Sequence, residues 1–530
     1  MSADAKYLRQ NIQVEPLVGR WYAWPHIISP ATAAMNVVNR HLAIMDSYVQ
    51  SPQVHAAAVK NPAMLGGPFI DLNGERVDEI KALIKATKEK QAPMIAFAAA
   101  IKELDQLLRT QATGFSLEPL YPKVPELLRG FVELGYDLNN HPSFRVIEPL
   151  LYKSKFYEPA HQSLMLSVIT NDDRPFILST PRLQRARDVH VEIPFASPEI
   201  DRLFRMKTEP GSVDEIANRL GVAPDDRSAF EAFFTTEPPR RYQKYTGEGL
   251  RWRYFGHACI LIESKDVSIL ADPVLSYTYD HEIARFTYED LPEHIDYVLI
   301  THNHQDHILF ETMLQLRNKI KTVVVPRNGN GSLQDPSLKM MFEAVGFKNV
   351  ISMDEFETID IPTGKILSVP FFGEHADLAI RTKSAFLIEM GRHRFMLAAD
   401  SCNIEPRLYE HVEKLVGKID VLFLGMECDG APLSWLYGPL LTRPLDRKMD
   451  HSRRLAGSNY DRGIDLVRRF ACKEAYVYAM GQEPWLNYIM SIKYTDASNP
   501  IKASNRLLET CKEIGVVAER LFGEREILVG

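Results

Sequence analysis

A dense group of histidine and acidic side chains follows one apolar segment and limits what this chain can fold into. Residues 297–300 predict a short buried strand, and residues 301–307, Thr-His-Asn-His-Gln-Asp-His, come directly after it. Side chains two apart on extended backbone point the same way, so His302 and His304 can bind one cation. Asp306 and His307 follow where the chain turns toward a helix, and they can reach a second cation. Because imidazole is a common metal ligand, the pattern predicts a metal site at the end of a strand.

Length and composition narrow the class of protein. A chain of 530 residues predicts two to four domains, at about 100–200 residues each. The net charge of −7 argues against a protein that mainly grips nucleic acid or an anionic membrane. We find no secretory signal and no apolar run of about 18 residues, so we expect no membrane span. The five cysteines are scattered without a Cys-x-x-Cys pair, which is typical of reduced thiols and predicts a cytoplasmic protein.

A domain boundary is predicted near residue 245. Pro238 and Pro239 are followed by Gly247 and Gly249, and such residues interrupt regular structure strongly. We therefore expect an N-terminal α+β domain over residues 1–245, involved in dimerisation or in contacts with the substrate partner. Its first ~110 residues are predicted to be helical, and residues 164–169 and 176–179 to form a β-hairpin. The catalytic domain is expected over residues 246–530.

The second part of the chain alternates short apolar segments with helical ones. Strands are predicted over residues 251–255, 258–263, 267–270, 297–300, 322–325, 366–369, 385–389, 395–398, 421–424 and 475–478. Helices are predicted over residues 409–416 and 464–470. Meander strands followed by strand–helix repeats favour two sheets packed face to face with helices outside.

The His-x-His-x-Asp-His segment resembles the signature of the metallo-β-lactamase superfamily. Residues 255–258 (Phe-Gly-His-Ala), 271–273 (Ala-Asp-Pro) and 397–400 (Leu-Ala-Ala-Asp) support the likeness, which covers roughly residues 250–485. The resemblance implies an αββα metallo-β-lactamase-like sandwich with a dinuclear site at the sheet edges, and Asp400 as the residue that bridges the two metals.

Two departures from that superfamily pattern concern the metal ligands. Residues 478–482, Tyr-Ala-Met-Gly-Gln, contain no histidine where family hydrolases place a late ligand. Between the first motif and Asp400, both Glu374 and His375 are candidates for the middle ligand. With His375 the set has four imidazoles and two carboxylates, which suits zinc. With Glu374 it has three of each, a harder shell that suits iron and redox chemistry.

The order of Glu374 and Asp400, the long N-terminal part and the total length resemble the diiron aminoacyl β-hydroxylases of antibiotic biosynthesis. This resemblance implies two iron ions (Fe2+/Fe3+) with an oxo or carboxylate bridge, and O₂ as co-substrate. It implies a homodimer, an external electron donor, and an aromatic, p-aminophenylalanine-like aminoacyl group held as a thioester on a nonribosomal peptide synthetase carrier domain. The implied metal ligands are His302, His304, Asp306, His307, Glu374 and Asp400.

Alternatives remain at this stage. A dinuclear zinc or manganese hydrolase of the lactonase or phosphodiesterase branch shares the same motif and would use a metal-activated hydroxide. A binding protein that kept a decayed fold would hold no metal. His257 and Asp272 are either groups that orient the ligands or structural residues.

Residues 443–454 carry five basic and two acidic side chains, a net of +3, and either contact an acidic carrier domain or form a solvated helix face. Trp435 and Tyr437 either line a pocket for an aromatic side chain or belong to the core.

Overall fold

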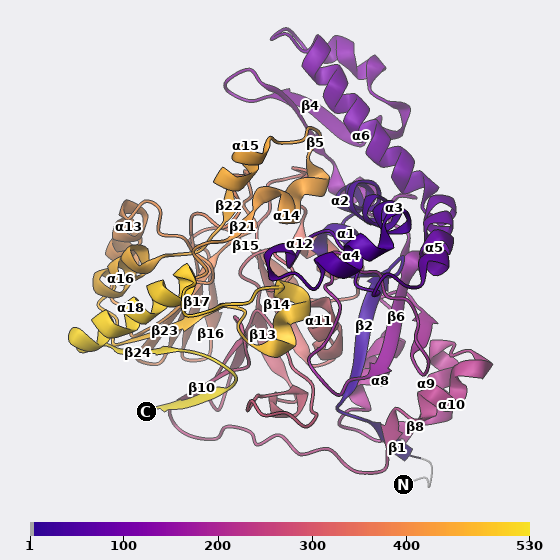
Figure 1. The fold of residues 1–530 in the computed structure, drawn as a ribbon. Coiled ribbons are helices and arrows are strands. Elements are labelled where there is room, and N and C mark those ends of the chain that lie inside the picture. Colours follow the sequence, from indigo (N-terminus) through magenta and orange to yellow (C-terminus); the bar gives the residue numbers. More distant parts are fainter. Residues whose placement is uncertain (1–4) are drawn as a thin grey trace.

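Two seven-stranded sheets form the centre of the second half of the chain in the computed structural model, which describes residues 5–530 (Figure 1). The first sheet has the order β15-β14-β13-β12-β11-β10-β25, and the second has the order β16-β17-β18-β19-β20-β23-β24. The first contains β10 (Leu250–Tyr254), β11 (Ile260–Glu263), β12 (Ser268–Ala271), β13 (Ile295–Leu299), β14 (Ile320–Pro326), β15 (Val350–Met353) and β25 (Arg525–Val529). The second contains β16 (Thr358–Ile361), β17 (Gly364–Val369), β18 (Ala385–Met390), β19 (His393–Leu397), β20 (Val421–Gly425), β23 (Glu474–Tyr478) and β24 (Val517–Arg520). All ten predicted strands of this half are confirmed.

Side-chain alternation along the strands places the sheets face to face. Ile260 and Ile262 of β11 lie in one buried cluster with Phe386 and Ile388 of the other sheet, whereas Leu261 packs on the opposite face. Since successive strand residues point to opposite faces, each sheet buries two apolar surfaces. Helices cover the outer faces: α11 (Phe310–Leu316) and α12 (Leu338–Ala344) on the first sheet, and α13 (Arg407–Val416), α16 (Tyr460–Arg469) and α18 (Asn499–Glu513) on the second. The predicted αββα sandwich is therefore confirmed.

The first half of the chain is α+β, as predicted, but its start is not helical. Residues 5–22 form β1 (Ala5–Leu8), β2 (Ile12–Val18) and β3 (Trp21–Tyr22). With β6 (Gln162–Val168) and β7 (Val189–Glu192), strands β2 and β3 form a four-stranded antiparallel sheet in the order β3-β2-β6-β7. The helices that follow are α1 (Pro25–Ile28), α2 (Pro30–Asn36), α3 (Ala43–Gln50), α4 (Pro52–Ala58), α5 (Val77–Lys90) and α6 (Ala92–Gln111). Four further α-helices come later in this half, α7 (Glu148–Leu151), α8 (Pro198–Arg205), α9 (Val213–Leu220) and α10 (Arg227–Glu231). The long-range pairing of β2 with β6 decided the early strands, and local periodicity does not report such a partner.

The predicted hairpin over residues 164–179 is half wrong. Its first arm is β6 (Gln162–Val168), whose neighbours are β2 and β7 (Val189–Glu192). Its second arm forms a turn instead, in which the Thr180 N–H donates to the carbonyl of Phe176. The Ile177 N–H donates to the carbonyl of Tyr488, so this segment packs on the far half of the chain rather than on β6.

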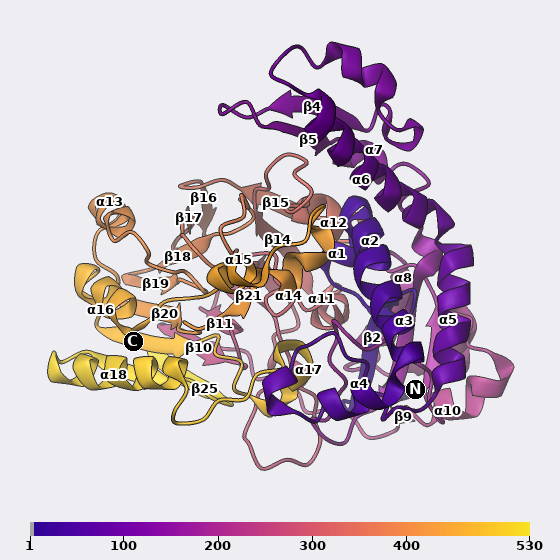
Figure 2. The same cartoon turned by 45° about the horizontal axis from the view of Figure 1, so that its top comes forward.

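A helical arm projects from the first half. Long α6 leads away from the body of the molecule to the hairpin of β4 (Val132–Tyr136) and β5 (Pro142–Val146), as both views show (Figure 2). The arm exposes large apolar side chains near its end, with Phe115 80% and Leu138 fully exposed.

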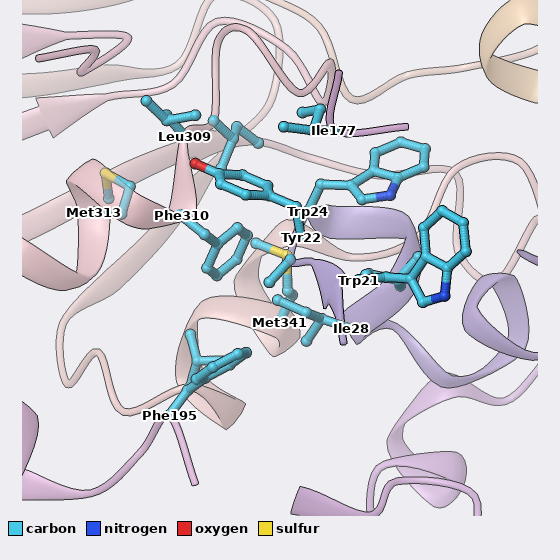
Figure 3. Close-up of a cluster of buried hydrophobic side chains, with 14 of the residues drawn as sticks. Trp21, Tyr22, Trp24, Ile28, Ile177, Phe195, Leu309, Phe310, Met313 and Met341 are labelled. Atoms are coloured by element: carbon cyan, nitrogen blue, oxygen red, sulfur yellow. The ribbon is translucent and has the colours of Figure 1, made fainter. Parts of the chain in front are cut away.

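The two halves of the chain share one apolar core. Trp21, Tyr22 and Ile28 pack in the same buried cluster as Phe310 and Met341 (Figure 3). Residues 236–249, where the domain boundary is predicted, contain no helix or strand. No helix of the described part of the chain is both long and apolar enough to span a bilayer.

Candidate metal centre

The predicted metal-binding residues all follow strand ends at one edge of the sandwich. Residues 301–307 come after β13, and Asp400 comes three residues after β19. Glu374 lies in the loop between β17 and β18. A bridge between His302 and Lys383 ties the first of these segments to that loop, so the two sheets meet here.

Six of these side chains and His257 form three overlapping groups. In each group the possible ligand atoms lie within 4.8 Å of one another, and every member is buried. The groups are His302, His304 and Glu374; His302, His307 and Asp400; and His257, Asp306 and His307. Because consecutive groups share His302 or His307, the geometry describes adjacent cation positions.

Several atoms in these groups are buried and have no hydrogen-bond partner in the described structure. They are His302 Nε2, Glu374 Oε2 and Asp400 Oδ1. Buried polar atoms are rarely left without a partner, so each such atom calls for an explanation such as a bound ion. A pair of bound cations would satisfy them, and a set of three imidazoles and three carboxylates would suit iron.

Asp400 lies between the two halves of the motif. Its Oδ2 is 3.1 Å from His307 Nε2 and 3.9 Å from His302 Nε2. Gly425, the last residue of β20, leaves room for it: a Cβ at Gly425 would lie 2.3 Å from Asp400 Oδ1. This position is consistent with a carboxylate that contacts both metals.

Three buried side chains hold the candidate ligands in orientation. Asp272 Oδ2 lies 2.7 Å from His307 Nδ1, and the Thr301 hydroxyl donates to the same oxygen. His257 Nε2 lies 3.0 Å from Asp306 Oδ2, and Tyr437 Oη lies 2.9 Å from His304 Nε2. Contacts of this kind fix the tautomer and the ring plane of a ligating histidine. Of the two roles that the sequence left open for His257 and Asp272, these contacts favour orientation.

Glu374 and His375 are separated by backbone geometry rather than by strand alternation. Residues 374–377 form a bend and turn, with φ of 68° at Glu374. Glu374 Oε2 is turned to within 3.2 Å of His304 Nδ1. His375 belongs to none of the groups found among residues 5–530; its Nδ1 is 3.4 Å from the carbonyl oxygen of Gly373.

Burial and neighbouring charges set the protonation of the site. Burial and the neighbouring imidazoles lower the pKa of His302 well below its usual value, so its ring is neutral and has a free lone pair. Burial also lowers the pKa of His307, but Asp272, Asp400 and Asp306 outweigh it and hold that pKa well above the usual value. Burial raises the pKa of Glu374 to about 7. The excess of buried carboxylates favours cations here.

A cavity of about 370 Å³, which we call the inner chamber, opens beside the metal-binding residues. It is lined by His304, Asp306, Glu374 and Asp400, and also by Leu65, Gly66, Glu427, Asp429, Pro432, Trp435, Met490, Lys493 and Tyr494. A second cavity of about 920 Å³, the outer chamber, shares Leu65, Gly66, Pro432 and Trp435 with it. The two chambers therefore adjoin at a common wall.

Both halves of the chain build that wall. The Trp435 indole N–H donates to the carbonyl of Gly66, and the Arg40 guanidinium donates to the carbonyl of Trp435. Sequence reasoning missed Leu65 and Gly66, since no local signal marks residues that only the tertiary fold brings to the site. Trp435 lines both chambers, whereas Tyr437 is buried against His304.

The basic run over residues 443–454 is divided between two tasks. Arg447 and His451, on helix α15 (Arg447–Ser452), line the outer chamber. Arg453 instead donates to the carbonyl of Ala376, and Arg454 donates to the carbonyl of Asp429. The run is thus partly structural and partly at the mouth of the cavities.

Comparison with known proteins gives two family matches and a relative that is similar along nearly the whole chain. Residues 7–238 match the family described as diiron non-heme beta-hydroxylase N-terminal domain, and residues 268–431 match the beta-lactamase superfamily domain. The chain is 39% identical, over 98% of its length and 99% of the relative's, to the 4-amino-L-phenylalanyl-[CmlP-peptidyl-carrier-protein] 3-hydroxylase of Streptomyces venezuelae.

Solved structures agree with this. The crystal structure of CmlA, a diiron beta-hydroxylase from Streptomyces venezuelae, superposes with a TM-score of 0.93 at 38% identity and covers both chains completely. A mutant of CmlA gives a TM-score of 0.91 over 99% of this chain and 100% of that one. The predicted resemblance and the predicted diiron cofactor are confirmed. This chain is a member of the diiron non-haem β-hydroxylase family, with an N-terminal domain of that family followed by a metallo-β-lactamase fold.

Proposed function

We propose that this protein is an O₂-dependent monooxygenase that hydroxylates the β-carbon of an aromatic amino acid held as a thioester on a nonribosomal peptide synthetase carrier domain. The side chain is p-aminophenylalanine-like. The observation that carries the proposal is the full-length similarity to a hydroxylase of carrier-bound 4-amino-phenylalanine. The alternative of a zinc or manganese hydrolase is not favoured, because that relative is a hydroxylase.

The six candidate ligands divide naturally between two irons. We assign His302, His304 and Glu374 to one iron, Asp306 and His307 to the other, and Asp400 to the position between them. The groups with unpartnered buried atoms support this assignment. When bound, the metal pair supplies the activation of O₂ and the transfer of electrons from an external donor.

The chain's own residues orient the ligands and shape the reaction space. Asp272 binds the Nδ1 side of His307, so Nε2 faces Asp400 and is the atom that would bind a metal once its proton is displaced. Tyr437 binds His304 Nε2 in the same way and leaves Nδ1 beside Glu374. The inner chamber receives the aminoacyl group, and its apolar wall of Leu65, Trp435 and Met490 suits an aromatic ring.

A matched pair of variants tests the choice of middle ligand. Glu374→Gln should lower the iron content from about two ions per chain, because it removes a charged donor. His375→Gln should retain both irons, since His375 belongs to no ligand group among the described residues. Iron is measured by elemental analysis of protein purified in parallel. If only the His375 variant lost iron, His375 rather than Glu374 would be the middle ligand.

The outer chamber is the natural path for the phosphopantetheine group that carries the substrate. It adjoins the inner chamber and opens beside Arg447 and His451, which suit the phosphate of a phosphopantetheine arm. Arg447→Glu should weaken turnover of carrier-bound substrate roughly tenfold or more. The same variant should turn over a short pantetheine thioester normally. Equal loss on both substrates would count against docking at this surface.

The activity itself is tested directly. The protein is reduced, exposed to O₂ with aminoacyl carrier domains, and the carrier is examined by mass spectrometry for one added oxygen. Release of the free amino acid without oxidation would instead indicate thioester hydrolysis and contradict the proposal.

We further propose that the protein forms a homodimer through its N-terminal part, that it has domains at residues 1–245 and 246–530, and that it acts in the cytoplasm. The exposed apolar end of the arm supports the first. The segment without helix or strand at residues 236–249 supports the second. The five unpaired cysteines support the third.

A further inference from the structure

Two carboxylates at the inner chamber, those of Glu427 and Asp429, belong to none of the metal groups. Glu427 lies two residues beyond the end of β20, and its side chain lines the chamber together with those of Glu374 and Asp400. The charges that act on it most strongly are those of Asp429, Asp400 and Glu374, all of them carboxylates. A poorly solvated anion among other anions is costly unless a cation is brought to it.

The backbone holds Glu427 close to Asp400. The Gly425 N–H donates to the carbonyl of Ala399 over 2.8 Å, and the Gly457 N–H donates to the carbonyl of Glu427 over 2.8 Å. A Cβ at Gly457 would lie 3.5 Å from the Glu427 carbonyl oxygen and 3.6 Å from that of Asp400. The segments that carry the two carboxylates are therefore neighbours at the same sheet edge.

The Glu427 carboxylate has one backbone partner in the described structure, and the Tyr494 side chain lies beside it. Oε2 accepts a hydrogen bond from the Gly430 N–H and so closes the turn over residues 427–430. A carboxylate accepts several hydrogen bonds, so Glu427 keeps the capacity to accept from a ligand in the chamber that it lines.

The proposed substrate brings a cation of its own to the inner chamber. An α-aminoacyl thioester carries its ammonium group on the carbon next to the β-carbon that is hydroxylated. When the β-carbon lies at the metal pair, the ammonium group therefore lies in the inner chamber, close to the metal ligands. A desolvated ammonium group is costly when it is left unpaired, and a carboxylate is the partner of opposite charge.

We propose that Glu427 binds the α-ammonium group of the aminoacyl thioester and thereby positions the β-carbon at the metal centre. This inference rests on the proposed function. It makes Glu427 a specificity residue, which selects α-aminoacyl groups over acyl groups that lack the amine.

Asp429 is the other free carboxylate of the chamber and is the less suitable partner. Its side chain is exposed, and its Oδ1 already accepts a hydrogen bond from the Asn499 amide over 2.9 Å. Solvent screens an exposed ion pair and leaves it little binding energy. Asp429 therefore offers a matched control.

Binding is measured with two probes, the pantetheine amides of phenylalanine and of 3-phenylpropionic acid, which differ only in the amine. Calorimetry uses the iron-containing protein without O₂. Wild-type protein should bind the amine probe about 100-fold more tightly. Glu427→Gln should bind both probes equally, because its amide oxygen still accepts from the Gly430 N–H while the charge is lost. Asp429→Asn should retain the wild-type preference.

Turnover separates this inference from the proposed function. If wild-type protein hydroxylates the aminoacyl carrier and Glu427→Gln keeps the full preference for the amine, only the role of Glu427 is overturned. Equal weakening of both probes in Glu427→Gln also overturns it, since that result indicates a structural role. Wild-type protein that neither hydroxylates the carrier nor prefers the amine overturns both proposals.

Discussion

At the scale of single residues, the metal centre depends on what surrounds the candidate ligands as much as on the ligands. Asp272, His257 and Tyr437 each contact one ligand side chain from behind, and Gly425 gives Asp400 the space that it occupies. None of these residues is a proposed ligand, yet each limits where a ligand atom can lie.

Gly425→Ala tests this dependence. The added Cβ would lie 2.3 Å from Asp400 Oδ1 and 2.9 Å from the carbonyl oxygen of Ala399, so Asp400 has to move. Iron affinity should fall about 10- to 100-fold. Elemental analysis after dialysis against a chelator measures it. Gly135→Ala, where a Cβ meets no atom within 4 Å, is the control and should retain iron. Unchanged iron content in both variants would show that Asp400 is not needed for retention.

At the scale of elements, loops at the ends of strands carry the candidate metal ligands. The arm of α6, β4 and β5 projects away from the rest of the described chain (Figure 2). The loop between β17 and β18 bends at Glu374 with a positive φ, a conformation that costs a non-glycine residue roughly 1–3 kcal/mol. Such strain persists only where the surrounding contacts hold it, and here it turns the carboxylate toward His304. The arm of α6, β4 and β5 instead extends into solvent and ends in exposed apolar side chains.

The arm should form the contact between the two copies of the proposed homodimer. Burying a large apolar side chain contributes about 1.5–3 kcal/mol, so Phe115→Glu and Leu138→Glu should each weaken dimerisation about tenfold or more. Sedimentation equilibrium measures the dissociation constant. Leu528→Glu, on β25, changes an equally apolar exposed residue outside the arm and should leave the dimer intact. Dissociation by the Leu528 variant alone would locate the contact elsewhere.

At the scale of the whole molecule, a buried ionic network fastens the two halves together. The Arg174 guanidinium donates to Glu15 at 2.7 Å and to Glu311 of α11 at 2.6 Å, and it stacks 3.5 Å over the ring of Tyr488. Arg182 donates to Glu15 as well, and the Tyr22 hydroxyl donates to Glu311. Because the network joins residues from both halves, the walls of the chambers depend on it.

The network predicts loss of stability in acid. Burial raises the pKa of Glu15, but the charges of Arg182 and Arg174 outweigh it, and the pKa is lowered. The ionised carboxylate therefore contributes stability above the unfolded-state pKa of about 4.3, and this contribution is lost as the pH falls through the folded-state pKa.

Glu15→Gln should cost about 3–5 kcal/mol of unfolding free energy at neutral pH, and the difference from wild type should shrink in acid. Urea unfolding at several pH values measures it. Glu133→Gln removes the exposed partner of Arg145 on the arm and should cost less than about 1 kcal/mol at any pH. A Glu15 variant whose stability stayed parallel to wild type across this pH range would contradict the assignment.

The sequence by itself determined the αββα sandwich and most of the candidate metal-binding residues at its edge. Alternating apolar residues specify strands locally, and His302, His304, Asp306 and His307 lie within six residues, so spacing alone brings them together. The family resemblance implied Glu374 rather than His375, and only the tertiary structure showed the bend that turns the Glu374 carboxylate toward His304. Likewise, only the tertiary structure paired β2 with β6, brought Leu65 and Gly66 to the chamber wall and set Glu427 beside Asp400. These contacts join residues far apart in the chain, and no periodicity in one segment records which distant segment it will meet.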